Sequence, residues 1–161
     1  MGHSDLNFLF FHSERLLEGL VQQVISSMAL QDKQDERPWD LSFWDGLSLR
    51  SSICVGVLIS DDLKTLGPWA IFEINEESTS GLLKVYCPPK LRQKGLSKQV
   101  LIKSFHQLRS LFGVTEIFLE VSSLNDSALK LYNSLGFTEY HCVSAFFSDG
   151  SDALKMACRV G

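Results

Sequence analysis

The order of apolar segments along residues 53–160 constrains the fold more than any other feature of this sequence. Ile53–Ile59, Trp69–Ile74 and Leu82–Cys87 are short runs rich in β-branched and aromatic residues, which is typical of strands. Helical spacing then alternates with further strand-like runs: helices over 95–112 and 126–135, strands over 116–121, 137–145 and 153–160. This alternation predicts an α/β or α+β domain built on one sheet.

The N-terminal part predicts one more strand and two helices. Leu6–Phe11 reads as a strand, and Ser13 is a candidate N-cap for a helix whose apolar stripe runs to Met28. Asp40 is a candidate cap for a short helix through Trp44, after a charged loop over 31–37. Neither repeats nor low-complexity linkers occur, so a single domain over residues 1–161 is expected.

Composition limits the location and the cofactor chemistry. No apolar run reaches the ~18 residues that span a bilayer, and the first residues do not read as a signal peptide. We therefore expect a cytoplasmic protein without a membrane partner. The four cysteines, Cys54, Cys87, Cys142 and Cys158, are scattered without zinc-ligand spacing, which predicts small buried residues and no metal site.

Charge is distributed unevenly along the chain. Residues 78–115 hold seven of the chain's 15 basic residues and none of its 19 acidic ones. A basic segment inside an acidic protein favours a polyanionic ligand held locally, rather than nucleic acid gripped over a broad surface. The alternative is a solvated helix face with a chance bias.

The segment Arg92–Lys98 follows a strand and opens a helix. Free N–H groups at a helix start favour phosphate, and Gly95 lets a ligand approach the backbone closely. A dinucleotide fingerprint needs three glycines where this turn has one, and the phosphate loop of nucleotide-binding proteins needs a second glycine that is absent. Taken alone, the segment is also compatible with an ordinary strand-to-helix turn.

A second informative segment covers residues 119–137. Glu120 stands at a strand end, where a carboxylate can face a cleft or simply water. Asn125 is a natural N-cap for the next helix, and Tyr132 shares that helix's apolar face with Ala128 and Leu135. The helical spacing predicts that the Tyr132 ring points inward, as a functional or a core tyrosine.

Together these segments resemble the GNAT superfamily of N-acetyltransferases. Arg92-x-x-Gly95-x-Ser97 is similar to its acyl-CoA pyrophosphate turn, and Asn125 with Ala128-x-x-Leu131-Tyr132-x-x-x-Gly136-Phe137 is similar to its second signature. The resemblance implies a central mixed, mostly antiparallel sheet of six to seven strands flanked by about four helices, and acetyl-CoA as acyl donor. It also implies donor contacts from the turn, from a strand edge and from a helix cap, namely Gln93, Lys94, Gly95, Leu96, Ser97, Lys98, Val85, Tyr86, Cys87 and Asn125.

A narrower resemblance is to the RimI-type ribosomal-protein-alanine N-acetyltransferases. It rests on Arg37–Asp40, Leu119–Val121 and the tail Phe146–Met156. It implies acetylation of a protein N-terminal α-amine, as on a small-subunit ribosomal protein. Two departures stand out: Ser97 where the family usually has Gly or Ala, and Phe146-Phe147 where it usually has two tyrosines.

Catalytic roles follow from this resemblance. Glu120 is the candidate general base and Tyr132 the candidate general acid, with direct attack by the amine in a ternary complex. An α-amine, of pKa about 7.7–8.0, is far easier to deprotonate than a lysine of pKa about 10.4. Three alternatives stay open: a small amine or lysine as acceptor, an acyl-enzyme on Cys87 or Cys142, and a non-catalytic CoA-binding module.

Overall fold

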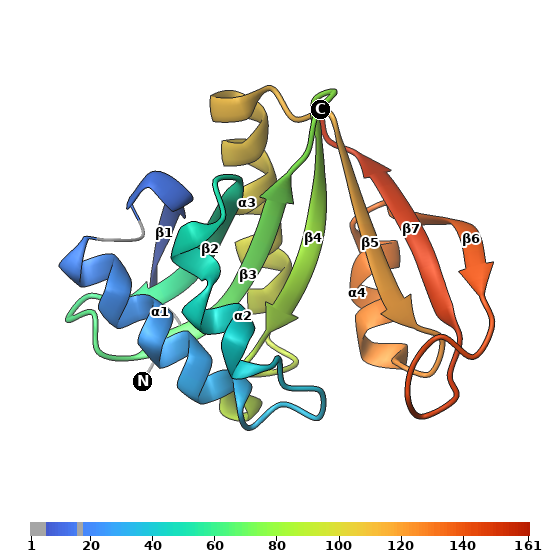
Figure 1. Ribbon diagram of the computed structural model, residues 1–161, viewed down its shortest axis with the longest axis horizontal. Helices are drawn as coiled ribbons and strands as arrows, with labels where there is room; N and C mark the ends of the chain where they lie inside the picture. The colour runs from blue at the N-terminus through green and yellow to red at the C-terminus, as the bar shows by residue number, and fades with distance from the viewer. Residues whose placement is uncertain (1–5, 16–17) are drawn as a thin grey trace.

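The computed structural model describes residues 6–15 and 18–161, which form a seven-stranded sheet with helices on both faces (Figure 1). The strands are β1 Leu6–His12, β2 Ile53–Ser60, β3 Leu66–Ile74, β4 Thr79–Tyr86, β5 Glu116–Ser122, β6 Thr138–Val143 and β7 Ala153–Arg159. The α-helices are α1 Gly19–Asp32, α2 Leu41–Asp45, α3 Leu96–Phe112 and α4 Asp126–Ser134. Short 3₁₀ turns are η2 Ser13–Arg15, η3 Leu47–Leu49 and η4 Pro89–Leu91.

The strand order is β1-β2-β3-β4-β5-β7-β6. All neighbouring pairs are antiparallel except β4 and β5, which are parallel. The parallel pair requires a crossover connection, and α3 supplies it. The expected mixed, mostly antiparallel sheet with flanking helices is therefore confirmed.

The sheet divides where its two parallel strands separate. The described β4–β5 ladder contains three residue pairs, from Thr79↔Glu116 to Gly81↔Phe118. Beyond this point the two strands diverge, so that the sheet opens like a V in Figure 1. One arm carries β1 to β4 and the other carries β5, β7 and β6.

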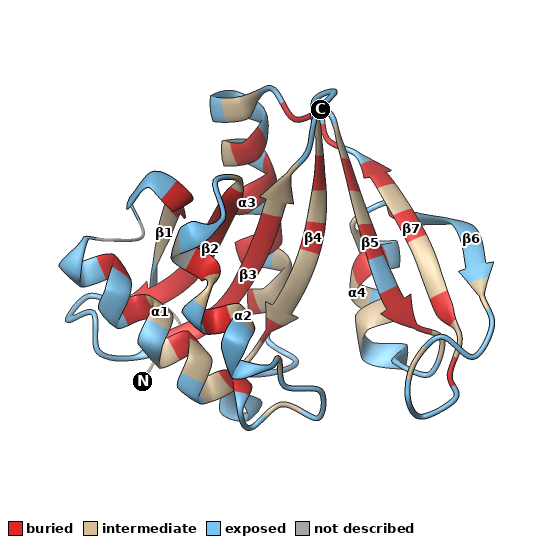
Figure 2. Cartoon of the chain, viewed as in Figure 1, coloured by how far each residue is buried: buried red, intermediate tan, exposed pale blue. Residues whose placement is uncertain are grey.

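Two apolar cores lie on opposite faces of the sheet. One core joins α3 and α4 to both arms, with Val100, Leu119, Tyr132 and Met156 among its members. The other core joins α1 and α2 to the β1–β4 arm around Trp69. Among the described residues, no helix covers the corresponding face of β5, β7 and β6 (Figures 1 and 2).

Two local predictions were wrong. Ser13 does not cap α1, because it lies in η2 and the residue at the N-cap of α1 is Glu18. Gly67-Pro68 is not a loop, because both residues are buried inside β3. The β2–β3 register shifts beside them, between Val57 and Ile59, and such a bulge accommodates a proline that has no N–H to donate.

The N-terminal helix otherwise follows its predicted stripe. Val21, Val24 and Met28 are buried against the sheet, whereas Leu20, in the first turn of α1, is 43% exposed. The predicted helix positions Leu16 and Leu17 lie outside the described residues. No helix in the described part of the chain is long and apolar enough to cross a membrane.

Candidate functional site

The turn before α3 has the backbone conformation of an anion-binding site. Gly95 is the N-cap of α3 with a left-handed φ of 72°, and Gln93 is also left-handed with a φ of 60°. Gly95 has no side chain that could cap the helix, so among the described residues the first N–H groups of α3 lack this partner and are available to a ligand. Arg92 donates from Nε to the carbonyl oxygen of Cys87 over 3.0 Å, which fixes the turn to the end of β4.

The side chains of this turn divide between solvent and core. Gln93 and Lys94 are exposed, whereas Leu96 is buried in the core, so only its backbone can serve a ligand. Ser97 and Lys98 are half-buried in the first helical turn. An uncapped helix start with nearby lysines is compatible with a diphosphate, and the contacts predicted for residues 93–98 stay a prediction.

Lys84 does not belong to this basic group, although the sequence placed it in the same acid-free segment. Its ammonium forms an ion pair with the buried carboxylate of Asp32 and lies 3.6 Å from Asp35. It also donates to the carbonyl oxygen of Arg37 over 2.8 Å. The charge of Lys84 is therefore paired with carboxylates of the protein itself rather than with a ligand.

The predicted strand edge lies beside the opening of the sheet. Val85 and Tyr86 pair with β3 on one side, whereas β4's described ladder with β5 ends at Gly81. The other edge of residues 82–86 therefore has no partner strand among the described residues. An extended ligand arm with amide groups can add to such an edge.

Asn125 is an N-cap, as predicted. Its side-chain oxygen accepts from the backbone N–H of Ala128 over 3.2 Å, while Ser127 Oγ lies 3.2 Å away. The residue is exposed at the start of α4. Its contact with the donor stays a prediction, because the carbonyl oxygen already has a structural partner.

Glu120 projects from β5 on the face that no helix covers. Its neighbours Leu119 and Val121 enter the core with α3 and α4, so the alternation of a strand turns Glu120 the other way. Glu120 Oε1 lies 3.2 Å from Lys155 Nζ on β7, and the Glu120 side chain is 44% exposed. The candidate base is thus a solvent-accessible carboxylate with one cationic neighbour.

Tyr132 lies on the opposite face of the sheet. It is 9% exposed, and its ring lies 5.7 Å from that of Phe137. Burial raises the pKa of Tyr132 to about 12. No other described residue forms a hydrogen bond with its hydroxyl. The phenol is therefore a protonated donor at neutral pH and remains available to a ligand.

Two cysteines were the alternative nucleophiles. Burial raises the pKa of the Cys87 thiol above its ordinary value, and a hydrogen bond with Ser97 and the charge of Arg92 only partly oppose this. The pKa of Cys142 is also raised, first by desolvation and then by Asp152 and Glu139. A raised pKa reduces the thiolate fraction, so neither thiol is activated. Cys142 is exposed, contrary to the expected burial.

A network around Asp32 fixes the segment that joins α1 and α2. Asp32 is 1% exposed, and its Oδ2 accepts from Trp39 N over 2.8 Å and from Trp44 Nε1 over 3.0 Å. Oδ1 accepts no hydrogen bond, and the ion pair with Lys84 compensates it instead. Sequence reasoning missed this network, because its members lie in three separate segments.

The α1–α2 segment also bridges the two arms of the sheet. Arg37 forms an ion pair with Asp149 in the loop between β6 and β7. The Arg37 guanidinium lies 4.6 Å above the ring of Phe147 in the same loop. Within the 31–45 segment, whose role the sequence left open, Trp44 packs in the core and Arg37 contacts the β6–β7 loop.

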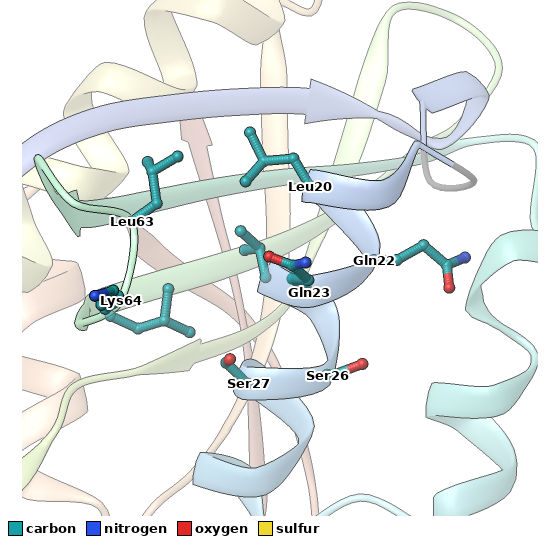
Figure 3. Close-up of a pocket in the computed structure, with 9 residues that line it drawn as sticks. Leu20, Gln22, Gln23, Ser26, Ser27, Leu63 and Lys64 are labelled. Carbon is teal, nitrogen blue, oxygen red and sulfur yellow. The ribbon is translucent and has the colours of Figure 1, made fainter.

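Two surface hollows lie apart from Glu120 and Tyr132. One, of about 470 Å³, lies between α1 and the β2–β3 loop and is lined by Gln23, Ser27 and Lys64 (Figure 3). The other, of about 700 Å³, runs from Lys98 along α3 to the end of β7. In the described part of the chain, no three His, Cys, Asp or Glu residues gather as metal ligands.

These features define a class of α/β domain: the sheet opens between two parallel strands, β4 and β5, and the helix that connects them begins with an uncapped turn rich in basic residues. Residues 20–137 match the acetyltransferase (GNAT) family, and the chain belongs to that family. It is 33% identical over 66 residues to an N-alpha-acetyltransferase of Sulfurisphaera tokodaii, and this match covers 41% of the chain and 40% of the relative. The aligned region thus spans less than half of that relative's length.

Solved structures share the fold at lower identity. The ribosomal-protein alanine N-acetyltransferase of Escherichia coli superposes with a TM-score of 0.76 at 20% identity, covering 96% of this chain and 95% of the other. The spermidine/spermine N-acetyltransferase SpeG of Vibrio cholerae gives a TM-score of 0.71 at 14% identity, covering 96% and 94%. Because proteins with different acceptors share this fold, the fold leaves the acceptor open.

A substitution at Gly95 tests the predicted diphosphate site. Gly95→Val is expected to weaken acetyl-CoA affinity at least tenfold, because a β-branched residue disfavours the left-handed φ that orients the turn. Gly113→Val is the matched control: Gly113 has a φ of 68° at the other end of α3, and a Cβ at either glycine meets no atom within 4 Å. Calorimetric titration should show lost affinity for the first variant alone. Equal affinities would contradict the site.

Proposed function

We propose that the chain transfers the acetyl group of acetyl-CoA to the N-terminal α-amine of a protein. The observation that carries the proposal is the opening between β4 and β5, which has Glu120 on one face of the sheet and Tyr132 on the other. In this proposal the donor and the acceptor reach the opening from opposite faces of the sheet. A donor arriving from the α3–α4 side and an acceptor arriving from the α1–α2 side can therefore meet there.

Each residue has a separate task in this proposal. The N–H groups at the start of α3 would hold the diphosphate of acetyl-CoA, and residues 85–87 would align its amide-bearing arm. Acetyl-CoA supplies an acetyl group activated as a thioester. Glu120 would accept the amine proton, directly or through one water, and Tyr132 would hold a proton near the departing sulfur. Direct attack in a ternary complex requires no cysteine nucleophile.

An α-amine acceptor is supported by the relatives and by the chemistry. The Sulfurisphaera tokodaii relative is an N-alpha-acetyltransferase, and the Escherichia coli structure is an enzyme for a ribosomal-protein alanine. Glu120 is a solvent-accessible carboxylate, and an acceptor amine of pKa about 7.7–8.0 is already partly neutral near pH 7.5, so it demands less of a base than a lysine of pKa about 10.4. We propose a small-subunit ribosomal protein as the acceptor, which implies a cytoplasmic enzyme.

An acceptor assay tests this proposal. Acetyl-CoA is combined with a peptide that begins with Ala, an N-blocked lysine peptide or spermidine, and thiol release and acceptor mass are followed. The wild type is expected to prefer the Ala peptide, and Glu120→Gln to lower its kcat/KM by about 10²-fold near pH 7. Preference for spermidine would indicate a small-amine enzyme. Acetyl-CoA binding without transfer to any acceptor would indicate a non-catalytic module.

A further inference from the structure

Three ionisable side chains form a row across the uncovered face of the outer arm. Glu120 on β5 is the register partner of Lys155 on β7, and Lys155 is in turn the partner of His141 on β6. Directly opposed residues of antiparallel strands project from the same face. Lys155 Nζ lies 3.2 Å from Glu120 Oε1, on the side away from the opening between β4 and β5.

This ion pair does not serve to hold the fold together. The Lys155 and Glu120 side chains are 32% and 44% exposed, and ion pairs at such exposure contribute little to stability. The β5–β7 ladder runs through seven register pairs and holds the strands without it. The main effect of Lys155 is therefore expected on function, through the positive charge that it places beside the candidate base Glu120.

That charge alters what an approaching acceptor meets. A lone carboxylate at the mouth of the site would attract every cationic amine, whereas a carboxylate paired with an ammonium group is close to neutral. A protonated amine is therefore attracted only weakly to the Glu120–Lys155 pair. An amine that is partly neutral near pH 7 depends less on this attraction, so Lys155 weakens its binding less.

We propose that Lys155 is a specificity-determining residue that disfavours acceptors almost fully protonated at neutral pH and so selects α-amines over lysine side chains and polyamines. This inference rests on the proposed function. At pH 7.5 a large part of α-amines, of pKa about 7.7–8.0, is neutral, against about one lysine in a thousand. A positive charge beside the base therefore disfavours lysine side chains and polyamines far more strongly than α-amines.

On β5, β7 and β6, the register separates the other charged groups of this face from Glu120. His141 lies on the far side of Lys155 from Glu120 in the register. Phe118 and its partner Ala157 stand between Glu120 and the next charged pair, Glu116 and Arg159. Arg159 is exposed and belongs to the same strand as Lys155, so it provides a control in which one positive charge is removed without touching the base.

The test compares Lys155→Gln, which removes the charge, with Lys155→Arg, which keeps it, and with Arg159→Gln. The acceptors are the Ala peptide, the N-blocked lysine peptide and spermidine. Lys155→Gln is expected to raise kcat/KM for spermidine and the lysine peptide about tenfold relative to the Ala peptide. Lys155→Arg and Arg159→Gln should keep the wild-type ratios.

Calorimetric titration of spermidine in the absence of acetyl-CoA gives a second readout. The dissociation constant should fall about tenfold in Lys155→Gln, and the difference should shrink at 1 M salt, where the screening length is about 3 Å. Thermal unfolding of all three variants should stay close to that of the wild type.

Failure of this inference differs from failure of the proposed function. If the wild type acetylates the Ala peptide and Lys155→Gln keeps its acceptor ratios and spermidine affinity, the role of Lys155 alone is overturned. The same holds if Lys155→Arg behaves like Lys155→Gln, because shape rather than charge would then decide. If the wild type prefers spermidine, the proposed acceptor class and the selective role of Lys155 both fall.

Discussion

Tyr132→Phe is expected to lower kcat by about 10²–10³-fold while leaving KM for acetyl-CoA within about threefold. The hydroxyl is the one feature removed, and general acid catalysis contributes effects of this size. The ring stays in its pocket against Phe137, and no described residue loses a hydrogen bond, so folding should be preserved. Steady-state kinetics and circular dichroism check the two expectations.

The chain offers a matched control for this change. Tyr140 is 57% exposed on β6, and its ring packs edge-on against Phe118 at 5.9 Å. Tyr140→Phe removes the same atom at a distance from the opening of the sheet and should leave kcat unchanged. If Tyr132→Phe retained wild-type kcat, Tyr132 would be a packing residue and the role of acid would have to be reassigned.

The raised pKa of Tyr132 also has consequences at alkaline pH. Since burial raises the pKa from an ordinary value of 10.0 to about 12, the hydroxyl stays protonated, and kcat should not fall through its ionisation below about pH 11. The unfolded chain ionises first, so the stability contributed by this group is complete below pH 10 and is lost as pH rises through 12. This loss amounts to about 2–3 kcal/mol, which Tyr132→Phe should abolish.

Local sequence patterns were sufficient to predict several parts of the site. The cap at Asn125, the left-handed Gly113 and the inward Tyr132 each depend on a few consecutive residues and on helical spacing. The strand assignments were also close, because apolar runs between polar turns leave few choices. Local rules failed at Pro68, where the bulge between two strands decides whether a proline is tolerated.

Contacts that depend on strand register could not be predicted. The pair Glu120–Lys155 requires β5 and β7 to be neighbours in one exact alignment, and a slip of one residue would place the two groups on opposite faces. The acidic partner of Lys84 lies 52 positions earlier in the chain, in a segment that reads as a solvated loop. Counting charges along the sequence therefore grouped Lys84 with the residues expected to bind a polyanionic ligand, whereas in the structure it forms an ion pair with Asp32.

Asp32→Asn is expected to lower the free energy of unfolding by about 3 kcal/mol, because it removes one partner of a buried ion pair. The Lys84 side chain is only 9% exposed, and the remaining carboxylate, of Asp35, is 3.6 Å away. Urea denaturation measures the change. An exposed pair supplies the comparison: Arg50 and Glu73 lie 3.5 Å apart with side chains 45% and 34% exposed, so Glu73→Gln should cost less than about 1 kcal/mol.

Asp32→Asn should also weaken binding of the peptide acceptor without changing the binding of acetyl-CoA. Asp32 accepts a hydrogen bond from the backbone N–H of Trp39. Lys84, the ion-pair partner of Asp32, donates to the carbonyl oxygen of Arg37, and the Arg37 side chain reaches the β6–β7 loop. Loosening that segment should raise KM for the peptide acceptor several-fold and leave KM for acetyl-CoA unchanged. Asp32→Asn combined with Lys84→Met should recover much of the stability but not the acceptor KM, since no ammonium group is then left unpaired and the amide oxygen can still accept from the two Trp N–H groups. Recovery of both would show that the network serves folding alone.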